Sequence, residues 1–343
     1  MTIVAVEPSE RAVVEEFYAV FAAAHEHDRT GPYPRIARFA IGFEDQWDDE
    51  TVAAHVFVRG GAVAGGYALR LPHKDNSHMA MLRTLVVAPG ARRAGIGSAL
   101  LEHATGVARA HGRRVLRGES PAQGPGAAFA RAHGFSSGLV EVRRALDLRA
   151  ADPGRLAELR REAERHAAGY TLERWRGSAP ERLLPDLAVL INGMNDAPMG
   201  DLDVTGEHWD VERVLAMERM NEAADTLMYA TIARHAATGE PAGYSALAVP
   251  RSRPDGWARQ TDTVVLRPHR GHRLGLLLKL ANLAWMREHE PDVEHIVTWN
   301  AASNSHMIAI NERMGFRVRD EWHQWQRPWT RRPARDGRLE TAG

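Results

Sequence analysis

Residues 85–98 combine the residue types of a strand that leads into a phosphate-binding turn. The apolar run Leu85-Val86-Val87 is followed, after four residues, by Arg92-Arg93-Ala94-Gly95-Ile96-Gly97-Ser98, where a helix is expected to begin. Such a turn directs unpaired backbone N–H groups and the positive end of the helix at one point, so a pyrophosphate can bind there without dedicated side chains. Gly95 and Gly97 would let it approach the backbone. The spacing matches neither the dinucleotide-binding GxGxxG motif nor the Gly-Lys-Ser/Thr of a Walker loop.

A second stretch of the same design follows about 180 residues later. Thr263-Val264-Val265 precedes, again by four residues, the run Arg270-Gly271-His272-Arg273-Leu274-Gly275-Leu276. The pairs Gly134-Phe135 and Gly315-Phe316 repeat the offset, which predicts an internal duplication. Arg273 stands where the first copy has a glycine, so it would either crowd the turn or donate to a phosphate.

Hydrophobic periodicity places each turn between a strand and a helix. In the first half we expect helices over 11–25, 36–41 and 97–110 and a short helix ending at 133–135, with strands over 4–6, 54–58, 62–70, 81–87 and 114–117 and a final pair of strands through Leu148. In the second half we expect helices over 183–194, 211–222, 275–288 and 304–314 and strands near 170 and over 227–234, 242–249, 262–266 and 295–299. The predicted division is a domain over 1–149, a linker helix over 150–168 that Asp152 and Pro153 begin, a domain over 169–328 and a loose tail over 329–343.

The composition argues against several classes of protein. The 343 residues suffice for two domains, and 44 Lys and Arg balance 44 Asp and Glu, so nucleic-acid binding is not expected. Cysteine is absent, which removes disulfides, thiolate metal sites and a cysteine nucleophile. Without a signal peptide or a long apolar segment, we expect a cytoplasmic protein that does not associate with membranes. The histidines 269, 272, 295 and 306 match no ligand spacing, so no metal is expected.

The turns resemble the cofactor motif of the GNAT acyltransferase superfamily, Gln/Arg-x-x-Gly-x-Gly/Ala after a strand. Arg92 to Gly97 fits it, and the order of elements in both halves is similar to that of the family, in a two-domain layout similar to mycothiol synthase. The resemblance implies an α/β fold of two tandem GNAT-like domains, each a mixed, mostly antiparallel twisted sheet flanked by helices. It also implies that acetyl-CoA or another acyl-CoA is the co-substrate. In the better-preserved first half it would be bound by Leu85, Val86, Val87, Arg92, Arg93, Ala94, Gly95, Ile96, Gly97 and Ser98. A second set is Val265, Arg270, Gly271, His272, Arg273, Leu274 and Gly275.

The activity that the resemblance implies is acyl-CoA-dependent N-acyltransfer to a small-molecule amine by direct attack on the thioester. This chemistry needs a neutral amine, a donor for the oxyanion and a proton for the departing thiolate. In the family the backbone N–H of Val87 or Val265 would be the oxyanion donor, and a tyrosine would be the acid. The tyrosine positions hold Ala130 and Asn311 here, so water or Ser98 would have to replace it. Candidates for the general base are Glu119, His78 and Asp262.

Two other functions remain open. The missing tyrosines would suit a non-catalytic module that binds or senses acyl-CoA, and the same fold could transfer an acyl group to a protein lysine or a hydroxyl. An acidic stretch over 194–212 lies where the family shapes its acceptor pocket; it would suit a cationic or amine acceptor, or it is a solvated loop whose Asp and Asn cap turns. A monomer or homodimer is expected, with Trp299, Trp322 and Trp325 in the second core or at the seam between the domains.

Overall fold

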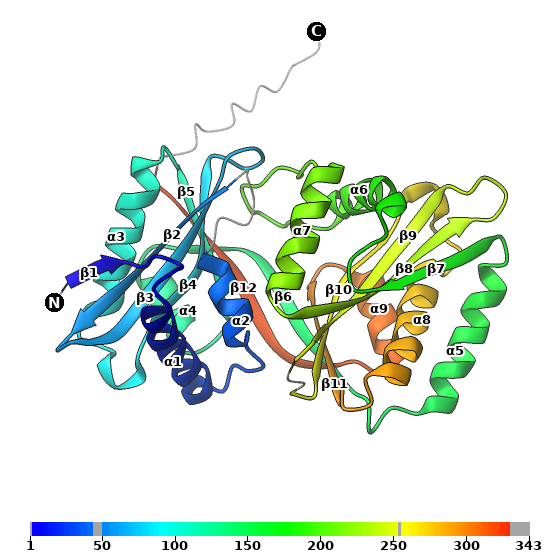
Figure 1. The fold of residues 1–343 in the computed structure, drawn as a ribbon, viewed down its shortest axis with the longest axis horizontal. Helices are drawn as coiled ribbons and strands as arrows, with labels where there is room; N and C mark the ends of the chain where they lie inside the picture. The colour runs from blue at the N-terminus through cyan, green and yellow to red at the C-terminus, as the bar shows by residue number, and fades with distance from the viewer. Residues whose placement is uncertain (1, 44–49, 253–254, 330–343) are drawn as a thin grey trace, which may run out of the picture.

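The computed structural model describes residues 2–43, 50–252 and 255–329, in which helices and strands alternate in the same order in two halves (Figure 1). The first half contains β1 (Thr2–Ala5), α1 (Arg11–Asp28), α2 (Ile36–Ala40), β2 (Glu50–Arg59), β3 (Ala62–Pro72), β4 (Met79–Val87), α3 (Ile96–Ala110), β5 (Val115–Pro121), α4 (Pro125–Ala132) and β6 (Ser136–Asp147). The predicted tail lies outside the described residues, apart from Trp329.

The second half begins with α5 (Pro153–His166), whose first turn is capped by the Asp152 side chain as the sequence predicts. It continues with β7 (Tyr170–Arg176), α6 (Leu184–Asn192), α7 (Val211–Ala223), β8 (Thr226–His235), β9 (Pro241–Pro250), β10 (Trp257–Val265), α8 (Leu274–His289), β11 (His295–Ala301), α9 (Ser305–Met314) and β12 (Arg317–Pro328). No helix of the described residues is long and apolar enough to cross a bilayer.

The strands that the described residues form belong to one 12-stranded sheet, in the order β1-β2-β3-β4-β5-β12-β6-β11-β10-β9-β8-β7. Among the described strands, only the β4–β5 and β10–β11 pairs are parallel, so the sheet is mixed and mostly antiparallel, which confirms the predicted fold class. The expected separate sheets are joined into one, because β6 and β12 pair with each other at the centre.

The two central strands are exchanged between the halves (Figure 1). The last strand, β12, pairs with β5 of the first half, while β6 pairs with β11 of the second half. Leu146 of β6 packs in the core beneath α8 and α9, and Trp325 of β12 packs on Ala127 and Ala130 of α4. The sequence predicts a pair of strands before residue 148, but the structure has one long strand there, β6. Its two neighbours in the sheet, β11 and β12, both come from the second half of the sequence.

Helices cover both faces of the sheet in each half. In the first half, α1 and α2 pack on one face and α3 on the other. In the second half, α6 and α7 pack on one face, and α5, α8 and α9 on the other. As Figure 1 shows, α2 and α7 lie toward the seam, so the two halves face each other across it.

A buried arginine joins the halves at this seam. The Arg143 side chain on β6 is only 1% exposed and forms an ion pair with Asp320 of β12. Its guanidinium lies over the rings of Trp299 and Trp322 and donates to the carbonyl of Thr30 at 2.9 Å. Two of the three tryptophans therefore lie at the seam, as the sequence predicts, whereas Trp325 is buried in the first half rather than the second.

Candidate functional site

Each half opens its sheet at the same place. β4 and β5 pair from Met79 with Val115 to Leu82 with Gly118, and beyond this point they separate. Leu85 to Val87 remain paired with β3 on their other side, so one edge of this segment is free to pair with an extended ligand. In the second half β10 and β11 pair only as far as Arg259 with Val297, and β10 then continues to Val265.

The turn after each of these strands has the same backbone conformation. Gly95 precedes α3 with φ +80°, and Arg273 precedes α8 with φ +55°, so the arginine adopts the left-handed conformation of the glycine it replaces. Neither helix start carries a side-chain cap, whereas α7 and α9 are capped by Asp210 and Asn304. The first N–H groups of α3 and α8 are therefore available to an anion.

The two loop arginines, which stand at the same place in each half, position their turns. Both terminal nitrogens of Arg92 donate hydrogen bonds to the carboxylate of Asp28 at the end of α1, each at 2.8 Å. Its Nε donates to the carbonyl of Val87 at 3.3 Å. Arg270 repeats this geometry, with Nε 3.1 Å from the carbonyl of Val265 and a terminal nitrogen 2.8 Å from Asp196. Each guanidinium thus fixes its turn, and the backbone amides are left to face a ligand.

A cavity of about 740 Å³ lies against the turn of the second half. Its walls are the end of β10, residues 269–276 at the start of α8, residues 303–310 at the start of α9, and residues 193–198 after α6. Arg273 lines it, but its guanidinium is held by Glu162 of α5, which also binds Arg313 at 2.7 Å. The crowding expected from Arg273 is therefore absent, and the volume matches the range of small-molecule and cofactor sites.

The turn of the first half is more closely covered. Phe129 of α4 packs so near Gly97 that a Cβ there would lie 3.1 Å from the ring. The His133 ring packs against Phe129 at a tilt, with ring centroids 4.0 Å apart, and its Nε2 lies 3.0 Å from the Ser98 hydroxyl. The Phe129 and His133 side chains therefore lie against the turn on the side of Gly97 and Ser98.

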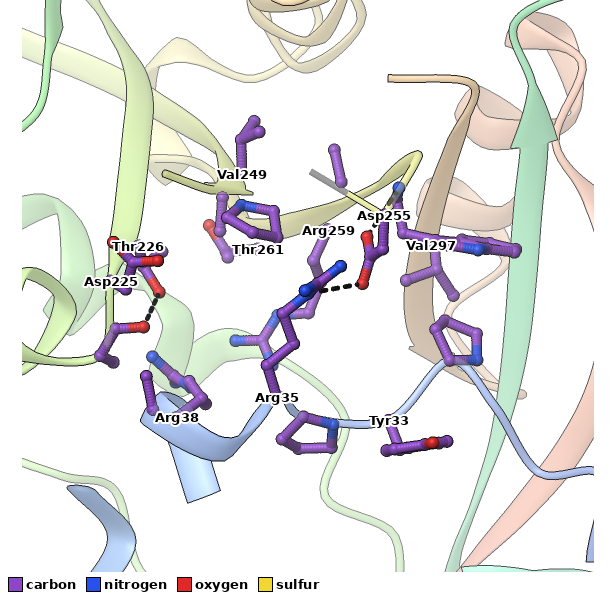
Figure 2. Close-up of a pocket in the computed structure, with 18 of the residues that line it drawn as sticks. Tyr33, Arg35, Arg38, Asp225, Thr226, Val249, Asp255, Arg259, Thr261 and Val297 are labelled. Atoms are coloured by element: carbon purple, nitrogen blue, oxygen red, sulfur yellow. Dashed lines mark hydrogen bonds and ion pairs between the residues drawn. The ribbon is translucent and has the colours of Figure 1, made fainter. Parts of the chain in front are cut away.

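Two cavities lie between the halves, on the opposite face of the splayed strands. One, of about 290 Å³, is bounded by α1, α2, residues 83–86 of β4, Glu119 and Arg259. The other, of about 200 Å³, adjoins it at Pro34, Arg38 and Arg259 and is lined by Trp257 and other residues of β9, β10 and β11 (Figure 2). An acceptor molecule that enters the cavity of about 290 Å³ reaches the segment of β4 that separates from β5.

The three candidate bases are in different surroundings. Glu119 lies one residue beyond the last β4–β5 pair and lines the cavity between the halves, with its Oε2 2.8 Å from Gln324 Nε2 of β12. Asp262 lies at the irregularity in β10, where burial raises the pKa of its carboxyl and Arg259 partly opposes this. His78 bonds to the carbonyl of Asp203 at 3.0 Å. It precedes β4, nine residues before Val87, which is about 30 Å along a strand.

The positions of the missing tyrosine provide no acid. Ala130 packs beneath Trp325, and Asn311 is buried and donates to Asn300 at 2.7 Å. Ser98, the proposed replacement, is bonded to His133. A thiolate, with an ordinary thiol pKa of about 8.5, is a fair leaving group even without a tyrosine at these positions.

The acidic stretch 194–212 is a clasp between the halves. Asp196 binds Arg267 and Arg270, which lower its pKa to about 2, and Asp210 caps α7. Further along, Asp201 N donates to the carbonyl of Gly138 at 2.7 Å. Glu207 and Thr205 bond to Asn195 and Asn76 through their backbones. Several polar groups of this stretch thus form structural hydrogen bonds and ion pairs within the protein, in agreement with the interpretation that its Asp and Asn residues cap turns.

Comparison with known proteins identifies the family. The model of the acetyltransferase (GNAT) family matches residues 14–135. A tandem GNAT protein from the clavulanic acid biosynthesis pathway, solved without AcCoA, is 31% identical over 97% of this chain and 99% of its own, with a TM-score of 0.79. The chain belongs to the GNAT family of acetyltransferases. This confirms the resemblance seen in the sequence and supports acetyl transfer from an acyl-CoA.

More distant structures share the GNAT fold. A GCN5-related N-acetyltransferase from Sphaerobacter thermophilus is 17% identical over 95% of both chains, with a TM-score of 0.64. One from Kribbella flavida is 14% identical over 95% of this chain and 71% of its own, with a TM-score of 0.53. No curated protein matches the chain.

Sequence reasoning missed the part of the site that the chain assembles across the seam. Gln324, which contacts Glu119, lies on the unpredicted strand β12. Arg38 and Arg259 meet between the halves although they are far apart in the sequence. The Arg-rich composition conceals such residues among many others.

Proposed function

We propose that this GNAT protein is an N-acetyltransferase that transfers an acetyl group from acetyl-CoA to a small-molecule amine. The observation that carries the proposal is the splayed strand pair beside an uncapped helix start, which both halves contain. It fits an acyl-CoA, because the pantetheine amides can pair with a free strand edge and the pyrophosphate can accept from helix N–H groups. The large cavity of the second half supports acyl-CoA binding there as well.

We assign transfer to the first half. Its acceptor cavity contains Glu119 together with Leu85 and Val86 of the splayed strand. Asp262 lines neither cavity between the halves within the described chain, and its raised pKa reflects burial. Glu119 is therefore the proposed general base, and the family match over residues 14–135 supports the same half.

Acetyl-CoA supplies an activated thioester carbonyl that the amine attacks directly, so that a C–N bond forms and the C–S bond breaks. Glu119 accepts the amine proton through water or directly. The N–H of Val87 is the proposed oxyanion donor. Arg92, anchored on Asp28, holds the turn that presents the helix N–H groups to the pyrophosphate.

Calorimetric titration with acetyl-CoA tests the binding part of the proposal. We expect binding to the native protein, weakened at one site by Gly95→Trp, whose Cβ position is open, and at the other by Gly275→Trp, whose side chain would fill the large cavity. Circular dichroism of both variants checks folding. The proposal is wrong if millimolar acetyl-CoA does not bind, or if neither substitution changes the titration.

Thiol release with a panel of amines tests the catalytic part. Glu119→Gln should lower kcat by about 10²-fold or more, because a general base contributes about 10²–10⁴-fold. Glu102→Gln, an exposed change on α3, is the matched control. Binding of acetyl-CoA without release on any amine would instead support the acyl-CoA sensor.

A further inference from the structure

Three arginines from three elements converge on the cavity beside the splayed strand. Arg38 comes from α2, Arg83 from β4 and Arg259 from β10. Arg38 and Arg259 also line the adjoining cavity, and Figure 2 shows their side chains entering it from the two halves of the protein. Grouping like charges in a partly enclosed space is unfavourable unless an opposite charge is bound there.

The neighbouring side chains only partly compensate this charge. A fourth arginine, Arg70, forms an ion pair with Glu50. Arg38 donates to the neutral amide oxygen of Asn221 at 3.3 Å. Within the part of the chain that the structure describes, neither Arg83 nor Arg259 forms an ion pair with a carboxylate.

The pKa values reflect the same arrangement. Burial, with repulsion from Arg259, Arg83 and Arg70, lowers the pKa of Arg38 to about 10. Burial also lowers the pKa of Arg259, with Asp262 and Glu119 opposing and Arg83 adding to the shift. The carboxylates of Asp262 and Glu119 therefore offset part of the positive charge of Arg259, and the arginines still repel one another.

We propose that the acceptor amine carries an anionic group, a carboxylate or a phosphate, which Arg38, Arg83 and Arg259 bind. The inference rests on the proposed function, because it names the acceptor class of that site. A guanidinium matches both anions, since its planar fork donates two parallel hydrogen bonds.

The position of the cluster suits an amine as well as an anion. Arg83 and Glu119 lie on neighbouring strands, each one residue beyond the last β4–β5 pair of Leu82 with Gly118. An acceptor whose anion binds Arg83 therefore has its amine beside the proposed base. The positive charges also disfavour the ammonium form of that amine, which increases the neutral nucleophile. The acidic stretch, which suggested a cationic acceptor, is instead engaged in the clasp and the turn of the second half.

Direct anion binding is the first test, with succinate and inorganic phosphate as calorimetric probes. We expect at least one to bind, and Arg259→Gln to weaken it about tenfold or more, since a hydrogen bond to a charged group contributes about 1.5–3 kcal/mol. Arg155→Gln, an exposed change on α5, should leave the titration unchanged. If Arg259→Gln fails to fold, Arg83→Gln, whose side chain is exposed in the cavity, decides. Absence of binding, or binding insensitive to both variants, overturns the inference.

Acceptor preference is the second test. β-Alanine and 2-aminoethyl phosphate should have kcat/KM values at least tenfold above that of β-alaninamide, and the better of the two identifies the anion. Arg259→Gln should reduce the ratio of kcat/KM between the anionic acceptors and the amide, mainly by raising KM for the anionic acceptors. Equal use of the amide overturns the inference and leaves the proposed function intact. Absence of transfer to every amine overturns the proposed function, and the anion titration then decides independently whether the arginines form an anion site.

Discussion

Trp325→Ala should destabilise the first half of the protein although the residue is near the end of the second. The Trp325 side chain is 4% exposed and packs on α4, and its Nε1 donates to Ser120 of β5 at 2.9 Å. Truncating a buried tryptophan costs about 3–5 kcal/mol, and the lost hydrogen bond adds about 1 kcal/mol. We therefore expect a loss of about 4–6 kcal/mol, a large part of a typical stability of 5–15 kcal/mol.

Hydrogen exchange read by mass spectrometry locates this loss. Amides of β5 and α4 should exchange faster in Trp325→Ala, and urea unfolding should shift to a lower midpoint. Val318→Ala is a control on the same strand: Val318 is 61% exposed, so its truncation should change stability by no more than about 0.5 kcal/mol. The strand exchange would be refuted if protection were lost only in β10 and β11 while β5 and α4 exchanged as in the native protein.

Three further predictions concern the turns and a buried lysine. Asp28→Asn removes the charged partner of Arg92 and should weaken acetyl-CoA binding to the first half about tenfold. Asp196→Asn removes the charged partner of Arg270 and should weaken binding to the second half by a similar factor. Both predictions are wrong if calorimetry shows no change in either affinity. Lys279 is 1% exposed and burial lowers its pKa to about 7, so the unfolded chain binds an additional proton between about pH 7 and 10.5, and stability should rise with pH there. Lys279→Met should stabilise by about 4 kcal/mol near pH 7 and give no such gain above pH 10.5 in urea titrations, while the exposed Lys74→Met should show no such trend. Equal gains at all pH values would exclude this cause.

The local parts of the fold were predictable because local physics determines them. The spacing of apolar residues indicated the strands and helices around both turns, including the strands over 54–58 and 62–70 that the structure pairs as β2 and β3. The equivalent positions of Arg92 and Arg270 in the two halves indicated a duplication. In agreement with this, each arginine forms a hydrogen bond to an aspartate of its own half, Asp28 or Asp196. These signals span only a few residues each.

The last strand was missed because it looks like a polar loop. β12 reads RVRDEWHQWQRP, and several of its polar side chains form hydrogen bonds to other strands and to the clasp. Gln324 donates to Glu119 and Glu141, and Gln326 donates to the carbonyl of Asp201. Pairing on both edges, together with the single buried side chain of Trp325, holds this strand in place.

The acceptor cavity was unpredictable for a related reason. Arg38 and Arg259 are 221 residues apart in the numbering and meet only because α2 and β10 face each other across the seam. No local sequence pattern indicates that two such distant residues line the same cavity. The acidic stretch, by contrast, was visible in the sequence, but whether a carboxylate faces a ligand or an arginine depends on the tertiary structure.

The exchange of the central strands has a consequence for synthesis on the ribosome. The neighbour of β5 is the final strand, so the N-terminal core stays incomplete until residues 317–328 have left the exit tunnel. Until then the edge of β5 and the site of Trp325 on α4 are exposed to water and to other nascent chains. A premature stop after α9 would thus release a chain defective at both ends, and a chaperone would be expected to recognise it through its first half.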